Sequence, residues 1–124
     1  YASISFDAAL AELFAPIAAG ARIVLAPPHA HRDLLGLFDR VRASRISVLQ
    51  TVPSVLRAAL DAGALHEATT LRYLVSGGEA LDHALVQRVR EQLPHIRIGN
   101  FYGPSEACVD STMIDVSEAL LARR

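Results

Sequence analysis

Lysine is absent from this sequence of 124 residues, and all twelve of its basic residues are arginine. The absence excludes a phosphate-binding loop of the Walker type and a Schiff-base enzyme, because both need a lysine side chain. Cysteine occurs only as Cys108, so the chain builds neither a disulfide framework nor a multi-cysteine zinc site. We interpret Cys108 as a small buried hydrophobic residue. The five histidines show no metal-ligand spacing.

Strong charge and long apolar runs are also missing. The net charge of -1 gives no electrostatic basis for binding nucleic acid. Arg22, Pro27 and Pro28 interrupt the most apolar stretch, which is far shorter than the roughly 20 residues of a membrane span. No secretory signal segment opens the chain. We therefore expect a cytoplasmic protein with no nucleic-acid partner and no membrane contact. Because the first residue is Tyr1 rather than Met, we also expect an internal piece of a longer protein.

The residues that are present alternate between helical and strand patterns. An apolar content of 52% indicates a folded chain. Strands are predicted at 21–26, 46–52, 71–76, 96–101 and 109–116, and helices at 6–19, 31–45, 53–60 and 80–93, with a weak helix start at 117–124. The strands are short and continuously apolar, which is typical of a parallel sheet covered by helices. The sequence thus predicts an α/β fold with mostly parallel strands.

Glycine and polar residues gather where three of the predicted strands end. Gln50 and Thr51 end one strand, SGGE at 76–79 ends another, and NFYGPSE at 100–106 ends a third. In open α/β sheets, ligands bind beyond the carboxyl ends of the strands. Paired glycines let backbone approach a ligand closely, and a hydroxyl followed by a carboxylate suits Mg²⁺. The residues therefore predict a nucleotide and metal site at this edge.

The same residues have an ordinary structural interpretation. Gly77 and Gly78 are also a plain strand-to-helix turn, with Glu79 and Asp82 capping the following helix. For Asn100 the corresponding alternative is a turn residue, and for Tyr102 it is a core aromatic residue.

Three segments, in order, resemble one known family. Residues 100–107, NFYGPSEA, resemble the N-x-Y-G-P-T-E-A motif of adenylate-forming enzymes. They are most similar to the amino-acid adenylation domains of nonribosomal peptide synthetases. Residues 74–81, LVSGGEAL, resemble the G-G-E segment of those domains, and 6–8 with 20–21 resemble their F-D-x-S…G-A segment. The resemblance implies that residues 1–124 are a central fragment, and no complete domain, of the large N-terminal subdomain of such an enzyme.

The resemblance implies a set of nucleotide-binding residues. Tyr102 would stack on adenine, and Asn100 would bond its exocyclic amine. Ser105 stands where the motif has Thr and keeps the hydroxyl that contacts phosphate, while Glu106 would bind Mg²⁺. The remaining implied nucleotide contacts are glycines and backbone: Gly78, Glu79, Ala80 and Gly103.

The resemblance also implies a set of substrate-binding residues. Asp7 would pair with the α-ammonium group of an amino acid, because an unpaired buried charge selects for its counter-ion. The implied side-chain pocket is lined by Ala8, Ala11, Gln50, Val75, Gly77, Phe101, Val109 and Asp110. A buried carboxylate at position 110 favours a substrate side chain that carries a hydrogen-bond donor. The alternative is that Asp110 bonds local backbone and the substrate is simply medium-sized.

The implied reaction has two half-steps. An amino acid and ATP form aminoacyl-AMP, with Mg²⁺ neutralising phosphate charge, and a phosphopantetheine thiol on a carrier protein domain then takes the acyl group. A condensation domain is the further implied partner. This segment lacks three features of the family: the phosphate loop with its lysine, the ribose-binding Asp and the catalytic lysine. No catalytic set is therefore complete here, and we predict that the chain alone is inactive. The alternatives are an acyl- or aryl-acid CoA ligase, which has no amine to bind at Asp7, and a non-catalytic α/β module.

Overall fold

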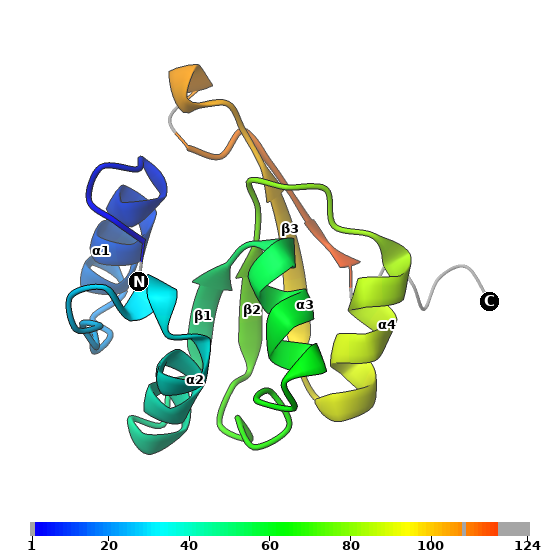
Figure 1. Cartoon of the computed structure of the whole chain (residues 1–124). Coiled ribbons are helices and arrows are strands. Elements are labelled where there is room, and N and C mark those ends of the chain that lie inside the picture. The colour runs from blue at the N-terminus through cyan, green and yellow to red at the C-terminus, as the bar shows by residue number, and fades with distance from the viewer. Residues whose placement is uncertain (1, 108, 117–124) are drawn as a thin grey trace.

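The computed structural model describes residues 2–107 and 109–116, and Figure 1 shows how the chain alternates between helices and strands. The α-helices are α1 (Ala8–Ala18), α2 (Leu34–Ala43), α3 (Pro53–Asp61) and α4 (His83–Gln92). Two short 3₁₀ turns, η1 (Ala30–Arg32) and η2 (Ser105–Ala107), lie in connecting segments. None of the helices among the described residues is both long and apolar enough to cross a membrane. The predicted helix start at 117–124 falls outside the described residues.

One sheet of four strands holds the fold together. Its strands are β1 (Val48–Thr51), β2 (Tyr73–Ser76), β3 (Arg97–Tyr102) and β4 (Thr112–Asp115), and they lie side by side in chain order. β1, β2 and β3 are parallel, whereas β4 returns antiparallel to β3. The predicted α/β fold with mostly parallel strands is confirmed.

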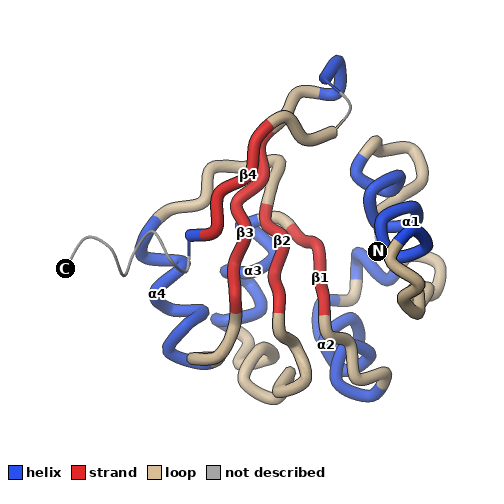
Figure 2. Tube along the Cα trace, turned by 180° about the vertical axis from the view of Figure 1, so that it is seen from behind, coloured by secondary structure: helices blue, strands red, loops and turns tan. Residues whose placement is uncertain are grey.

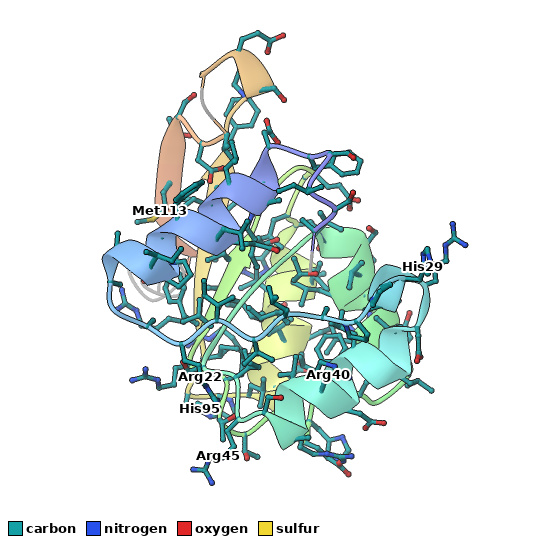
Figure 3. All side chains as sticks on the ribbon, turned by 90° about the vertical axis from the view of Figure 1, so that its left-hand side faces the viewer. Arg22, His29, Arg40, Arg45, His95 and Met113 are labelled. Atoms are coloured by element: carbon teal, nitrogen blue, oxygen red, sulfur yellow. The ribbon has the colours of Figure 1, made fainter. Side chains whose placement is uncertain are left out.

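The hydrophobic core lies on one face of this sheet. The inward side chains of the parallel strands, such as Leu49, Leu74 and Ile98, pack with buried residues of α2, α3 and α4. In Figure 1, α3 and α4 lie in front of the sheet, and the view from behind in Figure 2 shows the strands on the other face. No described helix covers that second face over β2 and β3.

Local sequence explains where the core helices begin. Pro53 occupies the first turn of α3, as predicted, where its missing N–H costs no hydrogen bond. The carboxylate of Asp33 caps α2 by accepting from Gly36 N at 2.9 Å, and that of Asp82 caps α4 by accepting from Leu85 N at 2.8 Å. The Arg57 side chain also bonds Asp82, and this bond, together with the backbone bond from Leu85, lowers the pKa of Asp82.

The N-terminal third departs from the sequence prediction. Residues 21–26 form no strand, because no described segment pairs with them and Pro27 and Pro28 lack the N–H groups that a ladder needs. α1 does form, but it lies beside the β1 edge rather than over the sheet (Figure 2). Only Ala9 of this helix is buried, and Phe14 is 63% exposed. The apolar face of α1 therefore packs against little of the described chain.

Candidate functional site

The carboxyl ends of the three parallel strands meet at one edge of the sheet. The register aligns Thr51 of β1 with Ser76 of β2, and Ser76 with Asn100 of β3. Three segments that are distant in the sequence therefore end side by side, as the sequence analysis predicted. Ser76 is fully buried there, and its Oγ has no partner among the described atoms.

Alternation along β3 divides the predicted site residues between the two faces of the sheet. Ile98 points into the core, so Asn100 and Tyr102 continue on the helix-covered side, while Phe101 lies on the opposite face. The half-buried Gln50 and Val75 share the face of Phe101, because they alternate with the buried residues of β1 and β2. The implied nucleotide residues of β3 and the implied substrate-pocket residues thus lie on different faces.

Two glycines shape the turn that follows β2. A Cβ added at Gly77 would lie 2.9 Å from the carbonyl oxygen of Phe101, so a side chain there would collide with β3. Gly78 has φ +78°, in the left-handed region that favours glycine. The turn therefore requires both glycines, and residues 78–80 are exposed at the edge of the sheet.

The Glu79 side chain has a role that differs from the structural alternative given above. Its Oε2 accepts from Ser54 N at 2.9 Å, and its Oε1 accepts from Ser54 Oγ at 2.7 Å. Glu79 therefore caps the preceding core helix, α3, while Asp82 alone caps α4. These two bonds fix the β2–α4 turn to the start of α3.

The segment after β3 projects beyond the sheet, at the top of Figure 1. Tyr102 is 71% exposed, and Ser105 and Glu106 are exposed in η2. The chain then returns beside itself, with Ser111 N donating to Tyr102 O at 2.9 Å. A Cβ added at Gly103 would lie 2.5 Å from Val109 O, so glycine is needed where the segment after β3 passes the segment that returns to β4. Tyr102 is therefore not a core residue.

Asp7 and Asp110 face the same region although they lie far apart in the sequence. Asp7 Oδ1 accepts from Ala8 N at 2.8 Å, which places its carboxylate at the start of α1 with Ala8 and Ala11 on the half-buried part of that helix. Asp110 is exposed in the described chain, so the expectation of a buried carboxylate at this position is wrong. Partial desolvation by nearby protein atoms nevertheless raises the pKa of its carboxyl group. The negative charge of Asp7 raises that pKa further. The structure thus brings these two predicted residues together.

The residues predicted to line the substrate pocket are half-buried in the described chain, except for the exposed Asp110. Two hollows lie elsewhere, one between α2 and the turn after α3, the other at the amino ends of the strands beside Val48, Tyr73 and Arg97. The described residues contain no group of three or more His, Cys, Asp or Glu side chains able to hold a metal ion by themselves.

Sequence reasoning missed two residues beside the site, Gly99 and Tyr73. Gly99 is buried in the middle of β3, and the Tyr73 hydroxyl and the Phe101 ring occupy the space over it. A glycine inside a strand is a recognised indication of close approach, so position 99 offered a clue. Tyr73 offered none.

Comparison with known proteins identifies the family. The sequence matches the AMP-binding enzyme family over residues 1–123, and the chain belongs to that family. Phosphinothricin tripeptide synthetase PhsB of Streptomyces viridochromogenes is 42% identical over 109 residues, which are 88% of this chain and 9% of that protein. An indigoidine synthase of Dickeya dadantii is 39% identical over 113 residues, 91% of this chain and 8% of that protein. This chain therefore spans less than a tenth of the length of either relative.

Solved structures agree with the fold. The nonribosomal peptide synthetase FmoA3 superposes with a TM-score of 0.84 at 28% identity, over 93% of this chain and 13% of its own. The adenylation domain AlmE of Vibrio cholerae, solved with glycyl-adenosine-5'-phosphate, gives 0.81 at 26% identity, over 92% of this chain and 21% of its own. The resemblance to adenylation domains seen in the sequence is confirmed.

Proposed function

We propose that this chain is the central part of an amino-acid adenylation domain of a nonribosomal peptide synthetase. The observation that carries the proposal is the register that ends three strands side by side at Thr51, Ser76 and Asn100. Asp110 passes close to Gly103 beyond the end of β3, and the charge of Asp7 acts on its carboxyl group. The domain would convert an amino acid and ATP into aminoacyl-AMP and pyrophosphate. A carboxylate oxygen of the substrate attacks the α-phosphorus of ATP, and the bond from that phosphorus to the β-phosphate bridging oxygen breaks.

Asp7 would hold the α-ammonium group of the amino acid. Asp7 is half-buried at the start of α1, and its Oδ1 accepts a hydrogen bond from Ala8 N. A carboxylate has room for several hydrogen bonds, so acceptor capacity remains for an ammonium group. Holding the ammonium would orient the substrate carboxylate toward ATP, and an acid that lacks the amine would leave Asp7 unpaired.

The loop after β3 and the turn after β2 would hold the nucleotide. The exposed Tyr102 ring offers a stacking face for adenine, and Asn100 lies two residues earlier on the same side of β3. The exposed backbone of Gly78, Glu79 and Ala80 would form the other wall of the adenine site. Gly103 and Ser105 would lie toward the phosphates.

Glu106 and Ser105 fit a magnesium ion that is shared with ATP. Both side chains are exposed in η2 and carry the hard oxygen donors that Mg²⁺ prefers. A site of one or two protein oxygens completed by substrate phosphates needs no cluster of three ligating side chains, in agreement with the described residues. When bound, Mg²⁺ would neutralise negative charge on the phosphates.

Asp110 favours a substrate whose side chain carries a hydrogen-bond donor or a positive charge. Desolvation and the charge of Asp7 both work against ionised Asp110 when the site is empty. A donor or cation from the substrate relieves that penalty, whereas an apolar side chain deepens it. Gln50, half-buried on the face of β1 that the pocket would use, adds a second polar group, so we expect amide, hydroxyl or amine side chains.

The second half-step needs partners. A phosphopantetheine thiol on a carrier domain would supply the nucleophile that takes the acyl group from aminoacyl-AMP as a thioester, with AMP as the leaving group. A condensation domain of the same synthetase would use that thioester. We place the synthetase in the cytoplasm, where ATP and amino acids are available. The lysines of the family's catalytic set would come from chain outside these residues, so the isolated chain is expected to form no aminoacyl-AMP.

Amino-acid-dependent exchange of pyrophosphate into ATP tests the proposal in an intact adenylation domain that contains this sequence. We expect Asp7→Ala to lower kcat/KM for the amino acid by about a hundredfold or more, since the ammonium loses its counter-ion. Asp33→Ala is the matched control, because Asp33 also caps a helix with its carboxylate but lies on α2. It should change exchange by less than about twofold while causing a similar loss of cap stability.

Two outcomes would contradict the proposal. Activation of amine-free acids that survives Asp7→Ala would indicate a CoA ligase. Absence of any ATP or AMP affinity in the unsubstituted intact domain would indicate a non-catalytic module.

A further inference from the structure

One position at the centre of the sheet has no side chain of its own and is filled by two neighbours. Gly99 of β3 is buried on the face away from the helices, level with Val75 of β2 and Asp115 of β4. A Cβ added there would lie 2.5 Å from Tyr73 Oη and 2.7 Å from Phe101 Cε2. Both distances are shorter than real Cβ contacts, so any side chain at position 99 must displace one of the two rings.

The two rings reach Gly99 from opposite directions. Phe101 lies two residues further along β3 on the same face, so its ring leans back from the carboxyl edge of the sheet. Tyr73 pairs in register with Arg97, at the amino end of β2, so its ring leans forward and across to the neighbouring strand. Both rings lie against the same small space over Gly99, so Tyr73 occupies the position into which the Phe101 ring would otherwise move back.

The Tyr73 ring is held in place by a charged neighbour on β3, Arg97. The guanidinium of Arg97 lies 5.6 Å from the centre of the Tyr73 ring, within the range of a cation–π contact. Arg97 is in turn held by Asp115, whose Oδ2 accepts from Arg97 Nη2 at 2.6 Å and from Nε at 3.0 Å. Because Arg97 holds the Tyr73 ring, we expect Tyr73 to block movement of the Phe101 ring toward the amino end of the strands.

We propose that Gly99 and Tyr73 are specificity-determining positioning residues, which set how far the Phe101 ring extends into the amino-acid pocket. The inference rests on the proposed function, because it takes Phe101 as a wall of that pocket. A methyl group at position 99 pushes the ring toward the carboxyl edge and reduces the room for the substrate side chain. Shortening residue 73 lets the ring retreat and enlarges that room. Neither residue contacts substrate directly.

The test compares variants of the intact adenylation domain in pyrophosphate exchange across amino acids of graded side-chain size. We expect Gly99→Ala to raise KM for the largest accepted amino acid by about tenfold and to shift preference to smaller ones, the scale of one methyl group in a tight pocket. KM for ATP should stay within about twofold. Tyr73→Leu should shift preference the opposite way. Gly99→Ala with Phe101→Ala should accept large amino acids again, since the displaced ring is gone.

Ile98→Val is the matched control, because it deletes one methyl from the adjacent β3 residue on the core face. It should lower thermal stability without changing selectivity. Unchanged selectivity in a folded Gly99→Ala variant overturns the inference. If Gly99→Ala does not fold, unchanged selectivity in Tyr73→Leu overturns it instead. In either case, amino-acid-dependent exchange by the wild type leaves the proposed function standing. No amino-acid-dependent exchange in the wild type overturns both.

Discussion

The two faces of the sheet differ in how completely they are packed. On the face covered by α3 and α4, Leu74 and Ile98 are 0% and 1% exposed. On the other face, Val48 and Met113 are 55% and 57% exposed, and α1 at the edge leaves Phe14 and Ile17 largely open. The hydrophobic contacts that stabilise the described chain therefore lie almost entirely on one side.

This difference separates core residues from the proposed amino-acid pocket along single strands. Side chains of one strand alternate between the faces, so a core residue and a site residue are immediate neighbours. In β2, the core residue Leu74 stands beside the implied pocket residue Val75, and in β3 Ile98 stands beside Gly99. The packed side fixes the positions of the strand ends, and the open side presents the residues that would contact substrate.

Removing a core side chain should give the largest change in stability. Leu74→Ala is expected to lower the free energy of unfolding by about 2–5 kcal/mol, because the buried methyl groups are lost and a cavity remains. Val48→Ala on the open face is the control. Denaturant titration of the intact domain measures both. A loss at Val48 as large as that at Leu74 would show that the open face is covered in the intact domain.

Loss of the Glu79 carboxylate should have an intermediate effect. Glu79→Ala removes both bonds to Ser54 and is expected to cost about 1 kcal/mol, as for other helix caps. Glu91→Ala, an exposed change on α4, should stay within about 0.5 kcal/mol. Thermal denaturation compares the two variants. Equal losses would mean that the bonds to α3 contribute nothing.

The ion pair between Arg97 and Asp115 should contribute less. The Arg97 side chain is 63% exposed and that of Asp115 is 14% exposed, so solvent screens the pair only from one side. A double-mutant cycle with Arg97→Ala and Asp115→Ala is expected to give a coupling of about 0.2–1 kcal/mol that weakens in 1 M salt. A coupling that does not respond to salt would contradict an exposed pair.

The smallest expected effect is a pH-dependent one at Asp110. Its pKa in the folded chain is raised above the ordinary value of 3.8, so the ionised form is disfavoured by folding. That cost is absent well below pH 3.8, develops as the pH rises from 3.8 toward the raised folded pKa, and is complete once the pH exceeds that pKa. Asp110→Asn should therefore raise Tm slightly at pH 7 and leave it unchanged at pH 3. A gain in Tm at pH 3 but not at pH 7 would mean that folding lowers the pKa of Asp110 instead of raising it.

Periodicity and capping residues were enough to predict the packed half of the molecule. The apolar runs around Leu49, Leu74 and Ile98 became the parallel strands, and Pro53 and Asp82 lie at the starts of α3 and α4. Local sequence specifies these features, because each depends on neighbours a few residues away or on a core that the chain itself supplies.

The remaining features depend on contacts that local sequence does not encode. Residues 21–26 have the composition of a strand but no described partner to pair with. Glu79 lies next to α4 in the sequence, yet its carboxylate reaches Ser54, 25 residues earlier. The filling of the space at Gly99 by Tyr73 likewise required the register between β2 and β3. The meeting of the three strand ends at one edge of the sheet was predictable, whereas the cross-strand contacts between Tyr73, Gly99 and Phe101 were not.

The alternation along β3 has a practical consequence for redesign. Odd-numbered positions there could be exchanged to test a different amino-acid substrate, while the even-numbered positions, which are proposed to bind the nucleotide, stay unchanged. Deleting a single residue between Ile98 and Tyr102 would invert this arrangement and turn both sets of side chains the wrong way. Point substitutions in this strand should therefore be far better tolerated than insertions or deletions.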